Sequence, residues 1–210
     1  MNKENIISFY VEIIKSILEI YRLNQNNNTQ KITKWILNWI IREYKGKIKL
    51  YASEDAIKWA KSQGISDSLS NYNWKDQVKK KEKGGLGDKK RENLHLEHII
   101  PISQIIENLF ETKTSNDIQN ILNEISVAWI KRDQQQKLDK GHKKERGENL
   151  KKCLECCKEY CGELTEIGEY KVPLDYDNES EKNDILWVFY FFNWNIRAFT
   201  NIKLGNFFMR

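Results

Sequence analysis

The helical spacing of apolar residues along the first third of the chain limits the possible folds more than any other feature. Between residues 4 and 23, apolar side chains recur three and four positions apart, which places them on one face of a helix. The same spacing recurs over residues 31–44 and again after Ser53, up to Gly64. Only two prolines and ten glycines interrupt the chain, and so few breakers favour long helices over frequent turns. We therefore expect a mainly α-helical protein whose N-terminal helices form a scaffold.

The rest of the chain divides into a polar segment, a short strand-and-helix region and a second helical region. We predict four parts: a helical N-terminal region (1–65), a flexible basic linker (66–92), a small core (93–147) and a helical C-terminal region (148–210). The predicted elements are a helix over 31–44 with Ile32, Trp35, Ile36, Trp39 and Ile40 on its buried stripe, a strand over 93–101, a helix from the N-cap Ser115 to Ile125, a strand over 126–131, a helix from Asp133 to Gly141, a helix over 148–160 and an aromatic-rich helix after Ser180.

The distribution of charge points to an anionic partner. The net charge is only +5, but residues 75–91 carry eight basic side chains against three acidic ones. A second basic stretch runs from Lys140 to Lys152. The two stretches flank the core segment, which is the arrangement expected around a nucleic-acid site. The alternative is that each stretch is a solvated linker.

The apolar stretches are too short or too interrupted to act as targeting or membrane segments. The first is broken by Glu12, Lys15 and Glu19, and the longest, residues 185–192, has eight residues where a span needs about 20. We therefore expect a cytoplasmic protein with no membrane partner, whose cysteines are thiols rather than disulfides. A structural zinc site is unlikely, because ligands on one straight helix do not converge on one ion. The four cysteines concerned are Cys153, Cys156, Cys157 and Cys161.

The segment from Leu94 to Pro101 combines a carboxylate with a neighbouring histidine. Glu97 offers a hard oxygen ligand for Mg²⁺ or Mn²⁺. His98 has a side chain whose ordinary pKa lies near neutrality, so it can act as a general base. In a regular strand these two side chains would point to opposite faces. We therefore expect the strand to break here, with Pro101 promoting the break.

The string Glu97-His98-Ile99-Ile100-Pro101 resembles the first motif of HNH (His-Me finger) nucleases. The resemblance implies a ββα-metal core, two strands and a helix around one metal ion, with Glu97 binding the metal and His98 acting as the base. The second half of the motif is similar to residues 128–138, where the position of the family's Asn or His ligand falls on Gln135. Asp133 and Gln134 remain alternative ligands. The resemblance covers residues 93–141, under a quarter of the chain.

Other polar residues near these motifs are candidates for contacts with a nucleic acid. His95 lies on the same strand face as Glu97, where it either contacts the scissile phosphate or supports its neighbours. His142 follows the motif helix and is a further candidate for the missing histidine ligand. The predicted phosphate-binding residues are His95, Arg132, Lys137, Lys143 and Lys144.

The resemblance implies a metal-dependent endonuclease that hydrolyses phosphodiester bonds in DNA, in restriction or another defence role. Two alternatives remain open: a catalytically inactive protein of the same fold that binds nucleic acid or a partner, and an RNA-cleaving toxin. The aromatic C-terminal helix is a plausible homodimer surface, because simultaneous cutting of both strands would need two copies.

Overall fold

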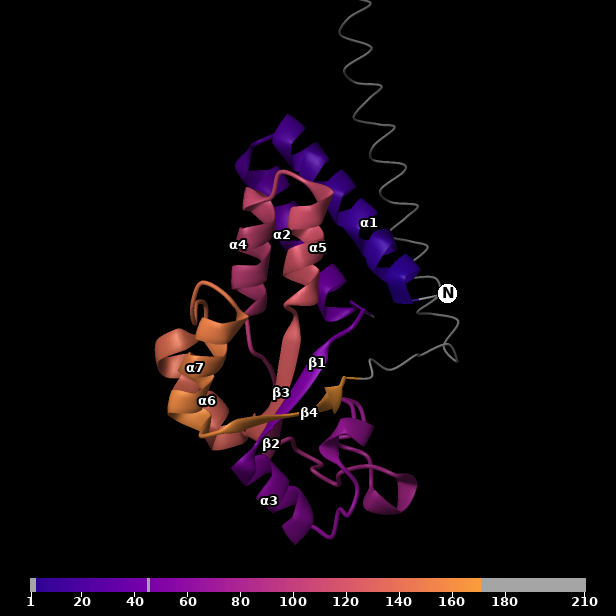
Figure 1. Ribbon diagram of the computed structural model, residues 1–210, viewed down its shortest axis with the longest axis vertical. Helices are drawn as coiled ribbons and strands as arrows, with labels where there is room; N and C mark the ends of the chain where they lie inside the picture. The colour runs from indigo at the N-terminus through magenta and orange to yellow at the C-terminus, as the bar shows by residue number, and fades with distance from the viewer. Residues whose placement is uncertain (1–2, 45, 171–210) are drawn as a thin grey trace, which may run out of the picture. The chain divides into compact units, whose positions relative to one another are not determined.

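The computed structural model describes residues 3–44 and 46–170 (Figure 1). These residues form seven α-helices, two short 3₁₀ turns and a four-stranded sheet. The aromatic helix predicted after Ser180 and its dimer surface lie outside the described residues. The elements are α1 (Lys3–Leu23), α2 (Asn27–Arg42), β1 (Lys49–Ser53), α3 (Glu54–Ser62), η1 (Leu69–Asn71), η2 (Lys81–Lys83), β2 (Leu94–His98), α4 (Ile102–Glu111), α5 (Ser115–Asn123), β3 (Ser126–Lys131), α6 (Arg132–His142), α7 (Leu150–Cys161) and β4 (Leu164–Glu169).

The sheet has the strand order β2-β3-β1-β4 and mixes parallel with antiparallel pairs. Strands β2 and β3 are antiparallel, with Leu94 opposite Lys131 and His98 opposite Val127. Strand β1 runs parallel to β3 and antiparallel to β4. Five of the six residues of β3 are buried, as expected for an apolar strand covered on both faces. The sheet therefore unites segments from both ends of the described chain.

Four helices pack together beside the sheet (Figure 1). Helix α1 contacts α2 and α5, and α4 contacts α2 and α5. Helix α5 begins with a capping box, in which Thr114 and Asp117 satisfy each other's backbone N–H groups. The insertion between β2 and β3 thus buries its apolar stripes against the N-terminal helices. Its buried residues include Ile105, Leu109, Ile118 and Leu122, and those of α1 and α2 include Ile14, Leu18, Leu37 and Ile41.

Helix α6 packs on β2 and β3, and α7 packs beside α6. Gln134 fixes the start of α6, because each hydrogen-bonding group of its amide has a partner. Its Oε1 accepts from Ser53 Oγ at 3.1 Å and from the Lys131 N–H at 2.9 Å. Its Nε2 donates to Asp55 Oδ2 at 2.9 Å and to the Cys161 carbonyl at 3.1 Å. Gln134 thereby joins β1, α3, α6 and α7.

The segment 66–92, predicted to be a flexible connector, is folded against the start of β2. Leu86 and Gln77 are fully buried and Asp88 is almost so. The Asp88 carboxylate accepts hydrogen bonds from Gln77 Nε2 at 3.0 Å and from the Leu94 N–H at 2.9 Å. It also accepts from the Glu92 N–H at 3.1 Å. Buried polar bonds of this kind leave no periodic signal, so the sequence pattern suggested a linker.

Several local expectations differ from the structure. Strand β2 ends at His98 rather than at residue 101, and Pro101 instead precedes α4. Helix α4 and strands β1 and β4 were not predicted from the sequence. The N-cap of α5 is Thr114 rather than Ser115. Ile32 and Trp35 are 56% and 69% exposed instead of lying on the buried stripe of α2. The expected helical majority is present, but the fold is a mixed α/β one with a small sheet.

The described residues of the predicted parts, 3–44 and 46–170, belong to one compact unit. Strand β1 comes from the predicted N-terminal region and β4 from the predicted C-terminal region, and both belong to the sheet that contains β2 and β3. None of the helices in the described residues has the length and apolar content that a bilayer-spanning segment requires.

Asp88→Ala should destabilise the protein by about 2 to 4 kcal/mol, because several buried N–H groups would lose their acceptor. The measurement is the free energy of unfolding from urea denaturation. Asp67→Ala is the matched control, since Asp67 is exposed in the same segment and its loss should cost under about 0.5 kcal/mol. Equal stability of the two variants would show that the loop does not depend on Asp88.

Candidate functional site

The Glu97 carboxylate lies on the face of β2 that α6 covers, and both of its oxygens have protein partners. Arg146 Nη2 donates to Oε1 at 2.6 Å, and His95 Nε2 lies 2.9 Å from Oε2. The Glu97 side chain is 15% exposed and that of Arg146 is 1% exposed. Burial alone would raise the pKa of Glu97, but the hydrogen bond from His95 and the charge of Arg146 hold it below its ordinary value. Glu97 is therefore ionised at neutral pH.

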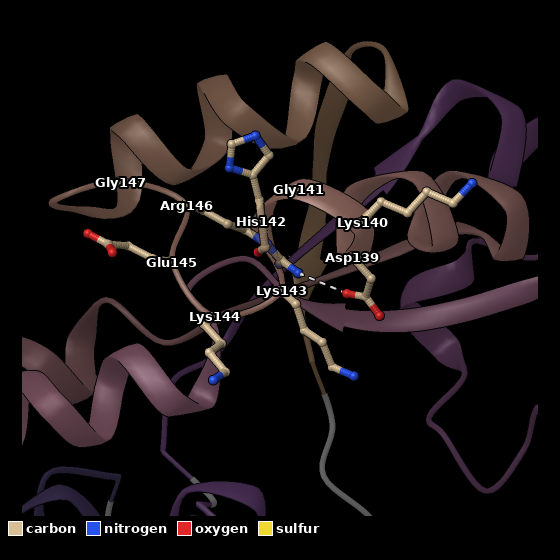
Figure 2. Close-up of a pocket in the computed structure, with 9 residues that line it drawn as sticks. All are labelled: Asp139, Lys140, Gly141, His142, Lys143, Lys144, Glu145, Arg146 and Gly147. Carbon is tan, nitrogen blue, oxygen red and sulfur yellow. Dashed lines mark hydrogen bonds and ion pairs between the residues drawn. The ribbon is translucent and has the colours of Figure 1, made fainter.

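Arg146 connects Glu97 to the end of α6. Its Nη1 donates to the His98 carbonyl at 2.5 Å, and its Nε donates to the His142 carbonyl at 3.1 Å. Its Nη2 also lies 3.8 Å from Asp139 Oδ1. Figure 2 shows this last contact as a dashed line in an open hollow that residues 139–147 line. Two carboxylates, one from β2 and one from α6, thus face the same buried cationic group.

Gln135, the predicted metal ligand on α6, lies close to this cluster through Asp139. Its side chain is 8% exposed, and its Nε2 donates to Asp139 Oδ2. Its Oε1 makes no hydrogen bond within the described residues. The structure therefore groups Gln135 with Glu97 by way of Asp139 and Arg146. The sequence analysis missed these last two residues, although Asp139 lies four positions after Gln135 and hence on the same helix face.

His98, the predicted base, is the last residue of β2, and its side chain is not hydrogen-bonded to that of Glu97. The strand stays regular through His98, and the ladder continues to Ile99, whose N–H donates to the Ser126 carbonyl at 2.9 Å. The expected break thus comes after His98 instead of between the two residues, and strand alternation directs their side chains to opposite faces. Burial lowers the pKa of His98 to about 4, opposed by Glu97 and reinforced by the charges of Arg42 and Arg146. Within the described residues its imidazole makes no hydrogen bond, so its nitrogens remain available.

His95 bridges Glu97 and Arg132, both of which the sequence analysis singled out. Arg132 Nη1 lies 2.9 Å from His95 Nδ1. Because a guanidinium only donates, Nδ1 must accept, and we assign the proton to Nε2, which donates to Glu97. The other side of the imidazole meets Trp74 edge-on, with 5.7 Å between ring centroids. His95 is therefore a supporting residue for Glu97 as well as a neighbour of Arg132.

The remaining candidates lie around this cluster. Asp133 is exposed in the first turn of α6, and the amide groups of Gln134 are already paired. His142 stacks against Tyr160 with 5.4 Å between ring centroids and points toward α7 (Figure 2). Of the predicted phosphate-binding lysines, Lys143 and Lys144 are exposed and line the hollow, and Lys137 is exposed on α6.

The four cysteines lie along α7, and three of them are buried. Cys153, Cys157 and Cys161 point into the protein at the spacing of one helix face, whereas Cys156 is partly exposed. Burial raises the pKa of Cys153 to about 11 and those of Cys157 and Cys161 to about 12. These side chains are therefore protonated thiols at neutral pH, and we attribute their placement to packing.

The donor set at Glu97 has the chemistry that Mg²⁺ or Mn²⁺ requires. Glu97, Asp139 and Gln135 all supply hard oxygen atoms, and a guanidinium nitrogen lies between the two carboxylates. Within the described residues, no group of three or more His, Cys, Asp or Glu side chains is placed to hold a metal ion. Mg²⁺ sites commonly use one or two carboxylates together with water and substrate phosphates. The residues present are therefore compatible with such an ion.

No family model, curated protein or solved structure matches this chain.

His98→Gln should change how stability depends on pH. The pKa of His98 is about 4 in the folded protein and about 6.5 in the unfolded chain, so below pH 6.5 protons bind preferentially to the unfolded chain. Between pH 7 and pH 5 the wild type should lose about 1 to 2 kcal/mol of unfolding free energy that the variant does not lose. Urea denaturation in EDTA at both pH values measures this difference, and parallel losses would contradict the buried neutral state of His98.

Proposed function

We propose that this protein is a metal-dependent HNH endonuclease that hydrolyses phosphodiester bonds in DNA. The observation that carries the proposal is that Glu97 from β2 and Asp139 from α6 approach one buried cationic group, Arg146, while Gln135 is hydrogen-bonded to Asp139. Strand β2, strand β3 and helix α6 follow the order of the ββα arrangement that the motif implies. The motif's acid and its helix ligand position are thereby brought to the same side of the hairpin.

Glu97, Gln135 and Asp139 would hold Mg²⁺ or Mn²⁺. When bound, the ion supplies electrostatic stabilisation of the charge that develops on the phosphate and on the leaving oxygen. Glu97 is suited to this role because its lowered pKa keeps it ionised. Asp133, exposed on a different face of α6, is the weaker candidate.

His98 would act as the general base toward a water molecule at the end of β2. Because its side chain leaves the strand on the opposite face from Glu97, this role requires the substrate phosphate to lie across the end of the strand. Its lowered pKa leaves the imidazole neutral at physiological pH, so a lone pair is free to accept a proton. Of the nearby charges, Glu97 favours the protonated imidazole most strongly, so it would stabilise the imidazolium formed by the transfer. Arg146 holds the His98 carbonyl and the Glu97 carboxylate together, and so positions the strand end.

The basic residues around the hollow would bind the nucleic-acid backbone. Lys143 and Lys144 are exposed there, Lys137 is exposed on α6, and Arg132 lies on the opposite side of Glu97 beside His95. Contacts of this kind fix the position of the duplex without reading its sequence. A role in restriction or another defence pathway, with the protein acting in the cytoplasm and as a homodimer, extends this proposal from the resemblance alone.

A second candidate function is binding of nucleic acid without catalysis. The observation that favours it is that Arg146 already neutralises Glu97 in a buried ion pair. A protein that keeps this ion pair permanently would retain the fold and the basic surface but hold no metal. An RNA-cleaving toxin, by contrast, would differ from the proposal only in its substrate.

Purified protein should nick plasmid DNA in Mg²⁺ or Mn²⁺ and not in EDTA. His98→Ala should lower the rate by about 10²- to 10⁴-fold, the range typical for loss of a general base. His142→Ala is the matched control, because His142 lies against Tyr160, and it should cleave at close to the wild-type rate. Metal-dependent nicking that survives His98→Ala would refute the assigned base. The same assay with an RNA substrate distinguishes a DNA endonuclease from an RNA-cleaving toxin.

Metal binding can be measured apart from activity through the melting temperature. A saturating divalent ion at about 100 times its Kd should add about 2.7 kcal/mol of stability, which corresponds to a rise in melting temperature of about 5 to 11 °C. Glu97→Gln should abolish the shift, whereas Glu145→Gln, at an exposed position of the same hollow, should retain it. A wild-type protein that shows no shift would instead support the non-catalytic alternative.

A further inference from the structure

Arg91 lies in the loop just before β2 and stacks on an indole ring. Its guanidinium carbon is 3.8 Å from the ring centroid of Trp74. The residue has a φ of 54°, a left-handed conformation that residues other than glycine seldom adopt. Asp88 closes the turn, because its carbonyl accepts from the Arg91 N–H at 2.9 Å and its carboxylate accepts from the next N–H at 3.1 Å. The loop thus accepts an unfavourable backbone conformation that places Arg91 over the ring.

Trp74 and Arg132 connect Arg91 to the imidazole of His95. The backbone N–H of Trp74 donates to the Tyr170 hydroxyl at 3.3 Å, and the indole ring meets His95 edge-on at 83°. Arg132 lies 2.9 Å from the Nδ1 of the same imidazole. The Arg132 N–H also donates to the Asn93 carbonyl at 2.9 Å, which joins the start of α6 to the end of the loop. Arg132 therefore contacts the His95 imidazole directly, whereas Arg91 is connected to it through the Trp74 ring.

Neither Arg91 nor Arg132 forms an ion pair with a carboxylate within the described part of the chain. Both are half-buried, and the Nε of Arg91 is buried without a hydrogen-bond acceptor. A partly desolvated guanidinium without a counter-ion is unfavourable, and an anion that binds there relieves the cost. The planar fork of an arginine stacked on an aromatic ring keeps its N–H edge available for a phosphate group.

The surroundings favour a polyanion over a small isolated anion. The stretch from residue 75 to 91 carries eight basic side chains against three acidic ones. The other nitrogen of His95 contacts Glu97 at 2.9 Å, so an anion bound by the arginines would lie next to the candidate metal ligands. An extended phosphodiester backbone meets both conditions, because its neighbouring phosphates can contact the two places at once.

We propose that Arg91 and Arg132, positioned by Trp74 and His95, bind neighbouring phosphates of one nucleic-acid backbone beside Glu97. The inference rests on the proposed function for the class of ligand, but the binding itself requires neither metal nor catalysis. Trp74 acts as a platform that holds the guanidinium of Arg91 in place before the ligand arrives, which lowers the ordering cost of binding.

The test is fluorescence anisotropy of the full chain with a labelled mixed-sequence DNA duplex, in EDTA so that no cleavage occurs, over a range of salt concentrations. Arg91→Gln should weaken binding about tenfold and reduce the slope of log K against log salt by about 0.9, the value for one lost phosphate contact. Trp74→Leu should weaken binding through loss of the platform, and Arg91→Lys should recover only part of the affinity. Lys89→Gln removes the same charge from an exposed position and should cost less than about threefold.

Each outcome decides the proposal. Equal binding by Arg91→Gln and Lys89→Gln, or no binding by the wild type, overturns it. An unchanged urea midpoint for Arg91→Gln, measured in parallel, shows that lost binding does not reflect unfolding. A labelled RNA of the same sequence identifies which backbone supplies the phosphodiester. If the wild type binds through Arg91 but never cleaves, the phosphate site stands and the nuclease proposal fails. If the wild type cleaves and Arg91→Gln still binds normally, the nuclease proposal stands and the phosphate site fails.

Discussion

The buried ion pair between Arg146 and Glu97 is the interaction on which the candidate site depends. Burying both charges costs several kcal/mol of desolvation, which is offset only when the remaining hydrogen-bonding groups are also satisfied. Arg146 meets this condition through the carbonyl groups of His98 and His142. The ion pair therefore holds the loop after α6 against the end of β2. Without it, Glu97 and the helix that carries Gln135 and Asp139 would lose their fixed relation.

The two oxygens of Glu97 face two sets of residues with different chemistry. Oε1 faces Arg146, with Asp139 and Gln135 behind it, and this side supplies oxygen ligands. Oε2 faces His95. Beyond His95 lie Arg132 and Arg91, which form no ion pair with a carboxylate within the described residues. Glu97 therefore lies between oxygen ligands on one side and arginines on the other, which suits a reaction in which a metal ion binds beside a phosphate. This division supports both proposals while keeping them separately testable.

Helix packing holds in place the strands that carry the candidate site. Helices α4 and α5 interrupt the hairpin formed by β2 and β3, yet the two strands pair without a break in register. The insertion is stable because its apolar stripes pack on α1 and α2 rather than on the strands. At the other side of the hairpin, Gln134 secures the start of α6 to β1, α3 and α7. Packing from all parts of the described chain thus converges on the short segment that carries Glu97 and His98.

Residues close together in the chain were predictable, because helix periodicity, capping and the string from Glu97 to Pro101 are local patterns. They predicted the positions of α1, α2, α3, α5, α6 and α7, the antiparallel strands and the candidate acid and base. The stripe of α4, from Ile102 to Leu109, was also present in the sequence and was overlooked. Strand β4 was not predictable, since only Leu164 in it is buried and the strand exists through pairing with β1. The contacts of Arg146, Asp139, Trp74 and Arg91 were decided by the tertiary structure alone, because each depends on a partner distant in sequence or on a backbone turn that no local pattern encodes.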